Sequence, residues 1–139
     1  MDKVIFACRH SAGRSQMAAA FFNRLADPAR ARAEAAGTTP ADRVHPEVVA
    51  VMGELGIDLS DRVPRRLTRE LAEQADVVVT MGCGDECPYI PGRRYVDWDL
   101  PDPKGRPLDE VRATRDDIAR RIDALVAELD REQSPARRS

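Results

Sequence analysis

Two mostly apolar runs stand out along the chain, Lys3–Cys8 and Ala75–Thr80. A strand with one wet face alternates apolar and polar residues, whereas a continuous apolar run indicates a strand buried on both faces of a parallel sheet. Two further segments, Arg32–Ala36 and Arg94–Val96, predict weaker strands, the first of them ending at Gly37. The pattern therefore predicts four strands.

Helical patterns lie between and after these strands. Gln16–Phe22 consists of good or acceptable helix formers and follows Ser15, which we expect to be the N-cap. His45–Leu55 has a proline in its first turn and a glycine after its end, with His45 as the expected cap, and Leu67–Glu73 predicts a short helix. From Leu108 to about Arg131, apolar residues keep helical spacing, which predicts a long amphipathic helix.

The succession of strands and helices predicts a parallel α/β sheet with right-handed crossovers. We expect a single three-layer domain over residues 1–130, with a four-stranded parallel sheet flanked by helices, and a polar tail over residues 131–139. In such sheets, ligands bind beyond the carboxyl ends of the strands. Both segments that contain cysteine follow predicted strands, so a site is expected there.

Composition narrows the function classes. The chain has 139 residues, 42% hydrophobic and 33% charged, which suits one globular core rather than a disordered chain. A net charge of −2 argues against general nucleic-acid binding, which needs a basic excess. No apolar run is long enough to cross a bilayer and no secretory signal opens the sequence, so we expect a cytoplasmic protein without membrane contact. Three cysteines then indicate metal binding, thiol catalysis or buried bulk rather than a disulfide framework.

The segment between the first strand and the first helix carries the pattern C-x5-R-S, from Cys8 to Ser15. A loop that enters a helix N-terminus directs backbone N–H groups at one point, where the helix dipole favours an anion. Arg14 would clamp a tetrahedral oxyanion with two parallel hydrogen bonds, and Gly13 would permit a turn with positive φ. Cys8 beneath the loop would be held as a thiolate nucleophile, with the Ser15 hydroxyl donating to it.

The loop residues themselves are the expected oxyanion-binding set: Arg9, His10, Ser11, Ala12, Gly13 and Arg14. Arg9 and His10 add positive potential that favours a dianion, and we expect His10 to hydrogen-bond the loop rather than act as a base. The alternative is a buried cysteine at a strand end, with a solvated Arg14 and a Ser15 that only caps the helix.

A second segment, Met81–Pro88, contains Cys83 and Cys87. Two thiols that close to a disulfide supply two electrons, so this pair together with Cys8 could reduce a bound substrate, whereas a single nucleophilic thiol could only attack it. Helical Cβ atoms four residues apart lie about 5–6 Å from each other, too far for a disulfide, so we expect a loop that deforms as it oxidises. The alternatives are a zinc site that uses Cys83, Cys87 and either Cys8 or His10, and inert cysteines.

These motifs resemble a known family. Cys8-x5-Arg14-Ser15 near the start of the chain resembles the low-molecular-weight protein tyrosine phosphatase superfamily, and the continuation Ser15-Gln-Met-Ala resembles the arsenate reductases that share its fold. Met81-Gly-Cys-Gly-Asp-x-Cys-Pro88 resembles the three-cysteine, actinobacterial-type arsenate reductases. The resemblance extends from Val4 to about Leu129 and implies a low-molecular-weight phosphatase-like fold.

The resemblance also implies roles for the site residues. Asp102, in the dipeptide Asp102-Pro103, matches the general acid of the superfamily. Cys8 would attack arsenate while Asp102 assists the loss of water. Cys83 would then attack the Cys8 sulfur and release arsenite, and Cys87 would attack Cys83 and carry the oxidation outward.

Other residues near the motifs receive lesser roles. Asp97 and Asp99 are expected to be solvated or to cap backbone groups. The superfamily usually carries Asn at the position of Ser11, whose shorter side chain could loosen the loop. Some three-cysteine relatives bind potassium, and the matching positions here are Ser11, Ala19 and Ala35, so we expect no potassium dependence and no metal or cofactor.

Partners follow from the cysteine count. Two relay thiols favour a thioredoxin-type protein as the reductant, and the actinobacterial resemblance leaves a mycothiol/mycoredoxin route as the alternative. An aromatic content of 4% and the Arg-His pair after Cys8 indicate a small polar pocket that suits arsenate better than phosphotyrosine. The competing functions are a low-molecular-weight tyrosine phosphatase and a non-catalytic regulator that binds an oxyanion or a metal.

Overall fold

A computed structural model describes residues 2–82 and 94–133 of the chain. Its elements are, in chain order, β1 (Asp2–Cys8), α1 (Arg14–Leu25), β2 (Ala31–Gly37), α2 (Pro46–Gly53), α3 (Arg69–Glu73), β3 (Val77–Thr80), β4 (Arg94–Asp97) and α4 (Leu108–Gln133). Each predicted strand and helix is present within a few residues of its expected bounds.

The strands form one four-stranded parallel sheet in the order β2-β1-β3-β4. Cys8, the last residue of β1, pairs with Gly37 of β2, and Ala7 pairs with Thr80 of β3. Because the strands all run the same way, their carboxyl ends meet at one edge of the sheet. Cys8 lies at this edge on β1, one of the two inner strands. The predicted fold class is confirmed.

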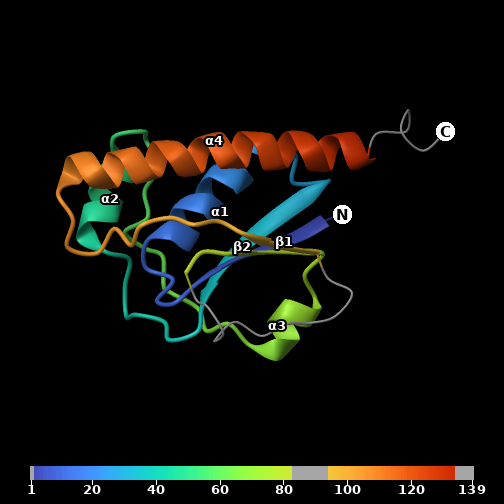
Figure 1. Ribbon diagram of the computed structural model, residues 1–139, viewed down its shortest axis with the longest axis horizontal. Coiled ribbons are helices and arrows are strands. Elements are labelled where there is room, and N and C mark those ends of the chain that lie inside the picture. The colour runs from blue at the N-terminus through green and yellow to red at the C-terminus, as the bar shows by residue number, and fades with distance from the viewer. Residues whose placement is uncertain (1, 83–93, 134–139) are drawn as a thin grey trace.

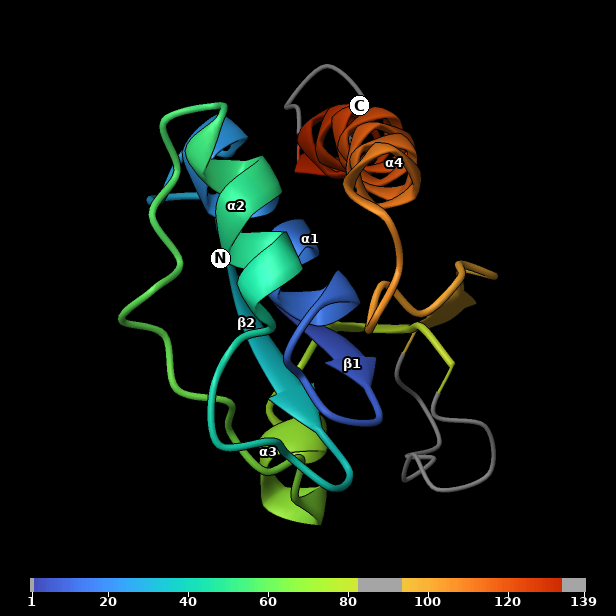
Figure 2. The same ribbon diagram turned by 90° about the vertical axis from the view of Figure 1, so that its left-hand side faces the viewer.

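Burial on both faces explains the continuous apolar run of β1. Val4 and Phe6 belong to the larger core cluster, which also takes residues from α1, α2 and α4. Ile5 and Ala7 point the other way into a smaller cluster that includes α3 residues. Figures 1 and 2 show α3 on one face of the sheet and the other three helices on the opposite face. The domain therefore has the three layers that the pattern predicted.

α4 crosses the outer layer as a single long helix (Figure 1). The apolar residues at its predicted helical spacing are buried from the second turn on, namely Val111, Ile118, Ile122, Leu125, Val126 and Leu129, whereas Leu108 at its start is 41% exposed. Its remaining positions are largely charged, so the helix covers the core with one face and meets water with the other. No helix in the described ranges combines the length and the apolar composition that crossing a bilayer requires.

Several predicted helix ends differ from the structure. α1 begins at Arg14 with Gly13 as its N-cap, so Ser15 lies inside the first turn and is not the cap; its hydroxyl faces Cys8 instead. His45 occupies the N-cap position of α2, but its side chain makes no capping hydrogen bond. α4 continues to Gln133, so the first residues of the expected tail are helical.

Candidate active site

The anion loop, Arg9 to Gly13, joins β1 to α1 above the sulfur of Cys8. Cys8 is 2% exposed, and the backbone N–H of Ser11 donates to its Sγ over 3.2 Å. Ser11 has a φ of +51°, and this left-handed turn brings its N–H back to the sulfur. The positive φ expected at Gly13 is wrong, since Gly13 has a φ of −144° and the turn is made at Ser11.

Close contacts, rather than unusual φ values, require glycine on two sides of the anion loop. A Cβ added at Gly13 would lie 2.7 Å from Cγ of Pro103, and one at Gly37 would lie 2.8 Å from the carbonyl oxygen of Arg9. Carbon atoms cannot approach their neighbours this closely. The ring of Pro103 therefore packs on one side of the loop, and the end of β2 packs on another.

Two serine hydroxyl groups form a chain of contacts that connects the Cys8 sulfur to the anion loop. Sγ of Cys8 and Oγ of Ser15 lie 3.1 Å apart, with the thiol as donor in the protonated form. Oγ of Ser15 and Oγ of Ser11 lie 2.9 Å apart. When Cys8 is ionised, its sulfur can only accept, so the Ser15 hydroxyl must then donate to it. The predicted contact between Ser15 and Cys8 is present, and Ser11 adds a second hydroxyl that the sequence did not indicate.

Arg14 begins α1 and is 8% exposed, which contradicts the alternative of a solvated guanidinium. Its Nη1 donates to the carbonyl oxygen of Leu100 over 3.0 Å. A Cβ at Gly82 would lie 2.6 Å from the same Nη1, so Arg14 also packs against the chain just after β3. The guanidinium is thereby fixed between the segment after β4 and the end of β3. A planar cation fixed at the edge of the sheet where β1 ends in Cys8 suits a tetrahedral oxyanion.

The segment that follows β4 brings Asp102 to the anion loop. Its neighbour Pro103 is the residue in contact with Gly13, so the half-buried Asp102 side chain starts from a backbone that packs against the loop. Oδ1 of Asp102 accepts from the backbone N–H of Lys104 over 3.0 Å. Asp97 is exposed and accepts from the Thr80 hydroxyl over 2.7 Å at the strand ends. Of these two carboxylates, Asp102 is the one whose neighbour in the chain packs against the anion loop.

His45 also borders the site, which the sequence did not indicate. Its Cδ2 would lie 3.5 Å from a Cβ on Gly13, and its backbone N–H donates to Ala12 O over 2.8 Å. Burial lowers the pKa of His45, with His10 and Lys104 acting in the same direction, while Glu47 and Asp102 oppose the shift. His45 is therefore favoured as a neutral imidazole next to the anion loop. Its sequence position before Pro46 pointed only to a helix start, because the contact with the loop is non-local.

Cys83 and Cys87 lie outside the described residues. Gly82, the last described residue before them, has a φ of +90° and contacts Arg14 as given above. Among residues 2–82 and 94–133, no group of three or more His, Cys, Asp or Glu side chains could hold a metal ion.

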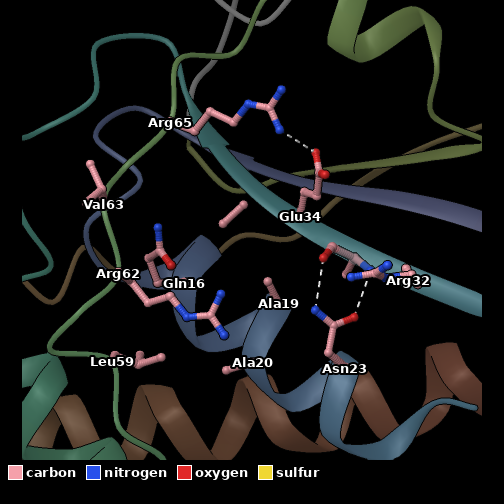
Figure 3. A pocket seen from close by; sticks show the side chains of 12 residues that line it. Gln16, Ala19, Ala20, Asn23, Arg32, Glu34, Leu59, Arg62, Val63 and Arg65 are labelled. Carbon is pink, nitrogen blue, oxygen red and sulfur yellow. Dashed lines mark hydrogen bonds and ion pairs between the residues drawn. The ribbon is translucent and has the colours of Figure 1, made fainter. Parts of the chain in front are cut away.

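A separate pocket of about 280 Å³ lies between α1, β2 and the chain from Leu59 to Arg65. Figure 3 shows Gln16, Asn23 and Arg62 among the side chains that line it. Asn23 hydrogen-bonds the backbone of β2, an edge strand of the sheet. Its Nδ2 donates to Ala33 O over 2.9 Å, and its Oδ1 accepts from Ala33 N–H over 2.8 Å. Cys8 does not line this pocket, and Gln16 is the lining residue that hydrogen-bonds the anion loop.

Comparison with known proteins agrees with this geometry. Residues 3–135 match the family described as low molecular weight phosphotyrosine protein phosphatase. The chain belongs to this family. The match spans almost the whole chain, including the anion loop and Asp102, so the resemblance drawn from the sequence motifs is confirmed for the family.

Within the phosphatase family, several similar proteins bear the name of another activity. A protein of Halobacterium salinarum named "Putative arsenate reductase" is 43% identical over 89% of this chain and 90% of its own length. A "Glutaredoxin arsenate reductase" of Synechocystis sp. is 34% identical over 93% of this chain and 99% of its own. The structure of a thioredoxin-dependent arsenate reductase of Corynebacterium glutamicum superposes with a TM-score of 0.82 at 36% identity, over 96% of this chain and 64% of that chain.

Proposed function

We propose that this protein is an arsenate reductase, in which Cys8 is the nucleophile and arsenate is the oxyanion held by the anion loop. The observation that carries the proposal is the environment of the Cys8 sulfur, with the Ser11 N–H at 3.2 Å and the Ser15 hydroxyl at 3.1 Å. These groups stabilise a thiolate at Cys8. The guanidinium of Arg14, which Leu100 holds in place, suits a tetrahedral oxyanion as the substrate of that thiolate. The names of the similar proteins favour arsenate over a phosphate ester.

The first chemical step forms a bond between sulfur and arsenic. The Cys8 thiolate attacks As(V), and one arsenate oxygen leaves as water after Asp102 donates a proton to it. The backbone N–H groups of the anion loop and the Arg14 guanidinium stabilise the charge on the remaining oxygens. The product of this step is a covalent thiol–arsenate adduct in which arsenic is still As(V).

The second step transfers two electrons. The Cys83 thiolate attacks the sulfur of Cys8, the new S–S bond forms, and the electron pair of the broken S–As bond stays on arsenic, which leaves as arsenite. Cys87 then attacks Cys83, so that Cys8 regains its thiolate and a Cys83–Cys87 disulfide remains. Support for this order comes from Gly82, which precedes Cys83 and packs against Arg14 at the site.

The Cys83–Cys87 disulfide needs an external dithiol to close the cycle. A thioredoxin-type protein is our proposed reductant, because similar proteins are named as thioredoxin-dependent and glutaredoxin arsenate reductases. The mycothiol/mycoredoxin route stays a prediction from the sequence motif. The two routes differ in the number of protein thiols they require: a small-thiol route can proceed with Cys8 alone.

An NADPH-coupled assay with thioredoxin, thioredoxin reductase and arsenate tests the proposal. We expect Cys8→Ser, Cys83→Ser and Cys87→Ser each to abolish multiple turnover. In the absence of thioredoxin, the reduced Cys87→Ser variant should still release one arsenite per protein, whereas Cys8→Ser and Cys83→Ser should release none.

Two results would lead to another function. Multiple turnover of Cys83→Ser with mycothiol and mycoredoxin, equal to that of the wild type, would establish the small-thiol route. Hydrolysis of an aryl phosphate by the wild type, with no arsenite formed from arsenate, would establish a phosphatase, the second candidate that the family match supports.

Asp102→Asn should slow the first step in either case, because both reactions protonate a leaving oxygen.

A further inference from the structure

Gln16 lies in the first turn of α1 and is 7% exposed. Its side-chain amide nitrogen, Nε2, donates to the carbonyl oxygen of Ser11 over 3.0 Å and reaches Oγ of Ser11 over 3.4 Å. A carbonyl oxygen can only accept, so the amide atom facing it must be the nitrogen, which fixes the orientation of the Gln16 amide. The one NH₂ group therefore has both the carbonyl and the hydroxyl oxygen of Ser11 within hydrogen-bond distance.

This orientation sets the direction of the hydrogen bonds that lead to the sulfur. Oγ of Ser11 accepts from Gln16, which leaves the hydroxyl hydrogen of Ser11 free to point at Ser15, 2.9 Å away. Ser15 then accepts from Ser11, and its own hydrogen points at the Cys8 sulfur, 3.1 Å away. The NH₂ group of Gln16 can only donate and a thiolate can only accept, so the two hydroxyl groups between them align in one direction when Cys8 is ionised.

We propose that Gln16 is a positioning residue that stabilises the Cys8 thiolate through Ser11 and Ser15; the inference rests on the proposed role of Cys8 as the nucleophile. Without the Gln16 amide, the Ser11 and Ser15 hydroxyls can align in the opposite sense, which favours the protonated thiol as donor. The bond to the Ser11 carbonyl has a second effect. It holds Ser11 at its left-handed φ, and that conformation presents the Ser11 N–H to the sulfur.

The surroundings of Gln16 allow the inference to be tested without disrupting the core. Gln16 lines the pocket shown in Figure 3, beside the small side chains of Ala19 and Ala20. Methionine has nearly the same length and shape as glutamine but cannot donate, so Gln16→Met removes the hydrogen bonds and keeps the packing. Gln16→Glu places a group there that, when ionised, can only accept, which reverses the preferred direction of the Ser11 hydroxyl.

The experiment measures the rate of Cys8 alkylation by iodoacetamide against pH. It uses the full chain carrying Cys83→Ser and Cys87→Ser, so that Cys8 is the one thiol that reacts. We expect Gln16→Met to raise the pH midpoint of alkylation by about 0.5–1 unit, which makes the rate below the midpoint about three- to tenfold lower. Gln16→Glu should raise the midpoint further, and Gln16→Asn, which donates but is too short, should not restore it.

Asn23→Met is the matched control. Asn23 lies on the same helix and lines the same pocket, but its amide bonds Ala33 on β2 rather than the anion loop. We expect its alkylation midpoint to equal that of the parent protein. Ser11→Ala removes the hydroxyl but keeps the carbonyl that Gln16 also bonds. In that background, adding Gln16→Met should therefore shift the midpoint by less than it does in the parent protein.

The inference is overturned if Gln16→Met and Gln16→Glu alkylate with the parent midpoint, if Asn23→Met shifts the midpoint equally, or if the Gln16 effect is undiminished in Ser11→Ala. Far-ultraviolet circular dichroism establishes that each variant is folded before alkylation is measured. Alkylation requires no arsenate, so failure of the proposed function and failure of this inference are separate results. A protein that makes no arsenite can still show the Gln16 effect on Cys8.

Discussion

Gly13 shows how a single residue at the site depends on a contact that is distant in sequence. Its φ is −144° rather than the positive value expected, and a Cβ at this position would lie 2.7 Å from the ring of Pro103. A proline ring cannot rotate away as a long side chain can. The space left by the missing side chain is therefore what lets Pro103, and Asp102 before it, approach the anion loop.

We predict that Gly13→Ala moves Pro103 and Asp102 away from the anion loop. Relief of such an overlap costs typically about 1–3 kcal/mol of unfolding free energy. Misplacement of a proton donor by about 1 Å can lower turnover by roughly 100-fold, so kcat should fall in the folded variant by up to that factor. Urea denaturation followed by Trp98 fluorescence and the coupled arsenate assay measure the two effects.

Gly53→Ala is the control for this prediction. A Cβ at Gly53, the last residue of α2, has no neighbouring atom within 4 Å. Alanine there should raise the unfolding free energy by about 0.4–1 kcal/mol, because it restricts the unfolded chain, and should leave kcat unchanged. Unimpaired turnover of Gly13→Ala would contradict the role given to the Pro103 contact.

The same residue shows where sequence reasoning reaches its limit. The spacing of Cys8 and Arg14 at a strand-to-helix junction was sufficient to predict the anion loop, because backbone geometry there is local. The reason for glycine at position 13 was predicted incorrectly, since its neighbour Pro103 lies on a distant segment. The left-handed turn at Ser11 was missed, because serine carries no local preference for positive φ.

At the scale of elements, α2 is fastened to the anion loop at its N-terminus. The backbone N–H of His45 donates to Ala12 O, and Pro46 begins the helix. The half-buried imidazole lies between the loop and the segment of Asp102 and Lys104, which contribute opposite effects to its lowered pKa. The net effect favours the neutral ring, so protonation of His45 opposes the folded arrangement of α2 and the loop.

We predict a corresponding pH dependence of stability. Because the folded protein lowers the pKa of His45, the unfolded chain takes up a proton first as the pH falls below about 6.5. The unfolding free energy should therefore decrease between pH 7.5 and pH 5.5, and decrease less in His45→Gln, whose side chain does not titrate. Urea denaturation at both pH values measures this difference; an equal decrease in the two proteins would contradict it.

Element prediction succeeded where the apolar pattern decides the structure. β1 reads as one apolar run because alternate residues enter two different cores, and α4 keeps its apolar spacing over most of its length. Helix starts were less accurate. α3 begins at Arg69 because the Thr68 side chain accepts from Leu71 N–H, and Leu67 before it packs into the smaller core as extended chain. The residue at which a short helix begins thus depends on a single hydrogen bond rather than on the periodicity of apolar residues.

On the scale of the whole molecule, the site joins segments that are far apart in the chain. The anion loop follows β1, Gly37 ends β2, Gly82 follows β3, and Leu100 and Pro103 follow β4. The carboxyl ends of the parallel strands bring these segments together, which the fold class alone predicted. Their detailed contacts, such as that of Arg14 with Leu100, depend on packing across the sheet and could not be predicted from the sequence pattern.

A ligand held by all these segments should stabilise the fold as a whole. Phosphate has the shape and charge of arsenate, so we expect it to bind the anion loop and Arg14 in the resting protein. At ten times its dissociation constant it should add about 1.4 kcal/mol to the unfolding free energy. For a chain of 139 residues this corresponds to a rise in Tm of about 5 °C, measured by calorimetry at constant ionic strength.

Two arginine variants identify where the phosphate binds. Arg14→Leu should lose the rise in Tm, because the guanidinium that is fixed beside Cys8 supplies the paired donors for the oxyanion. Arg65→Leu removes the same charge from the exposed pair with Glu34, on the wall of the pocket in Figure 3, and should keep the full rise. The reverse result, with the rise lost in Arg65→Leu and kept in Arg14→Leu, would mean that phosphate binds in that pocket. In that case Arg14 would not bind the oxyanion.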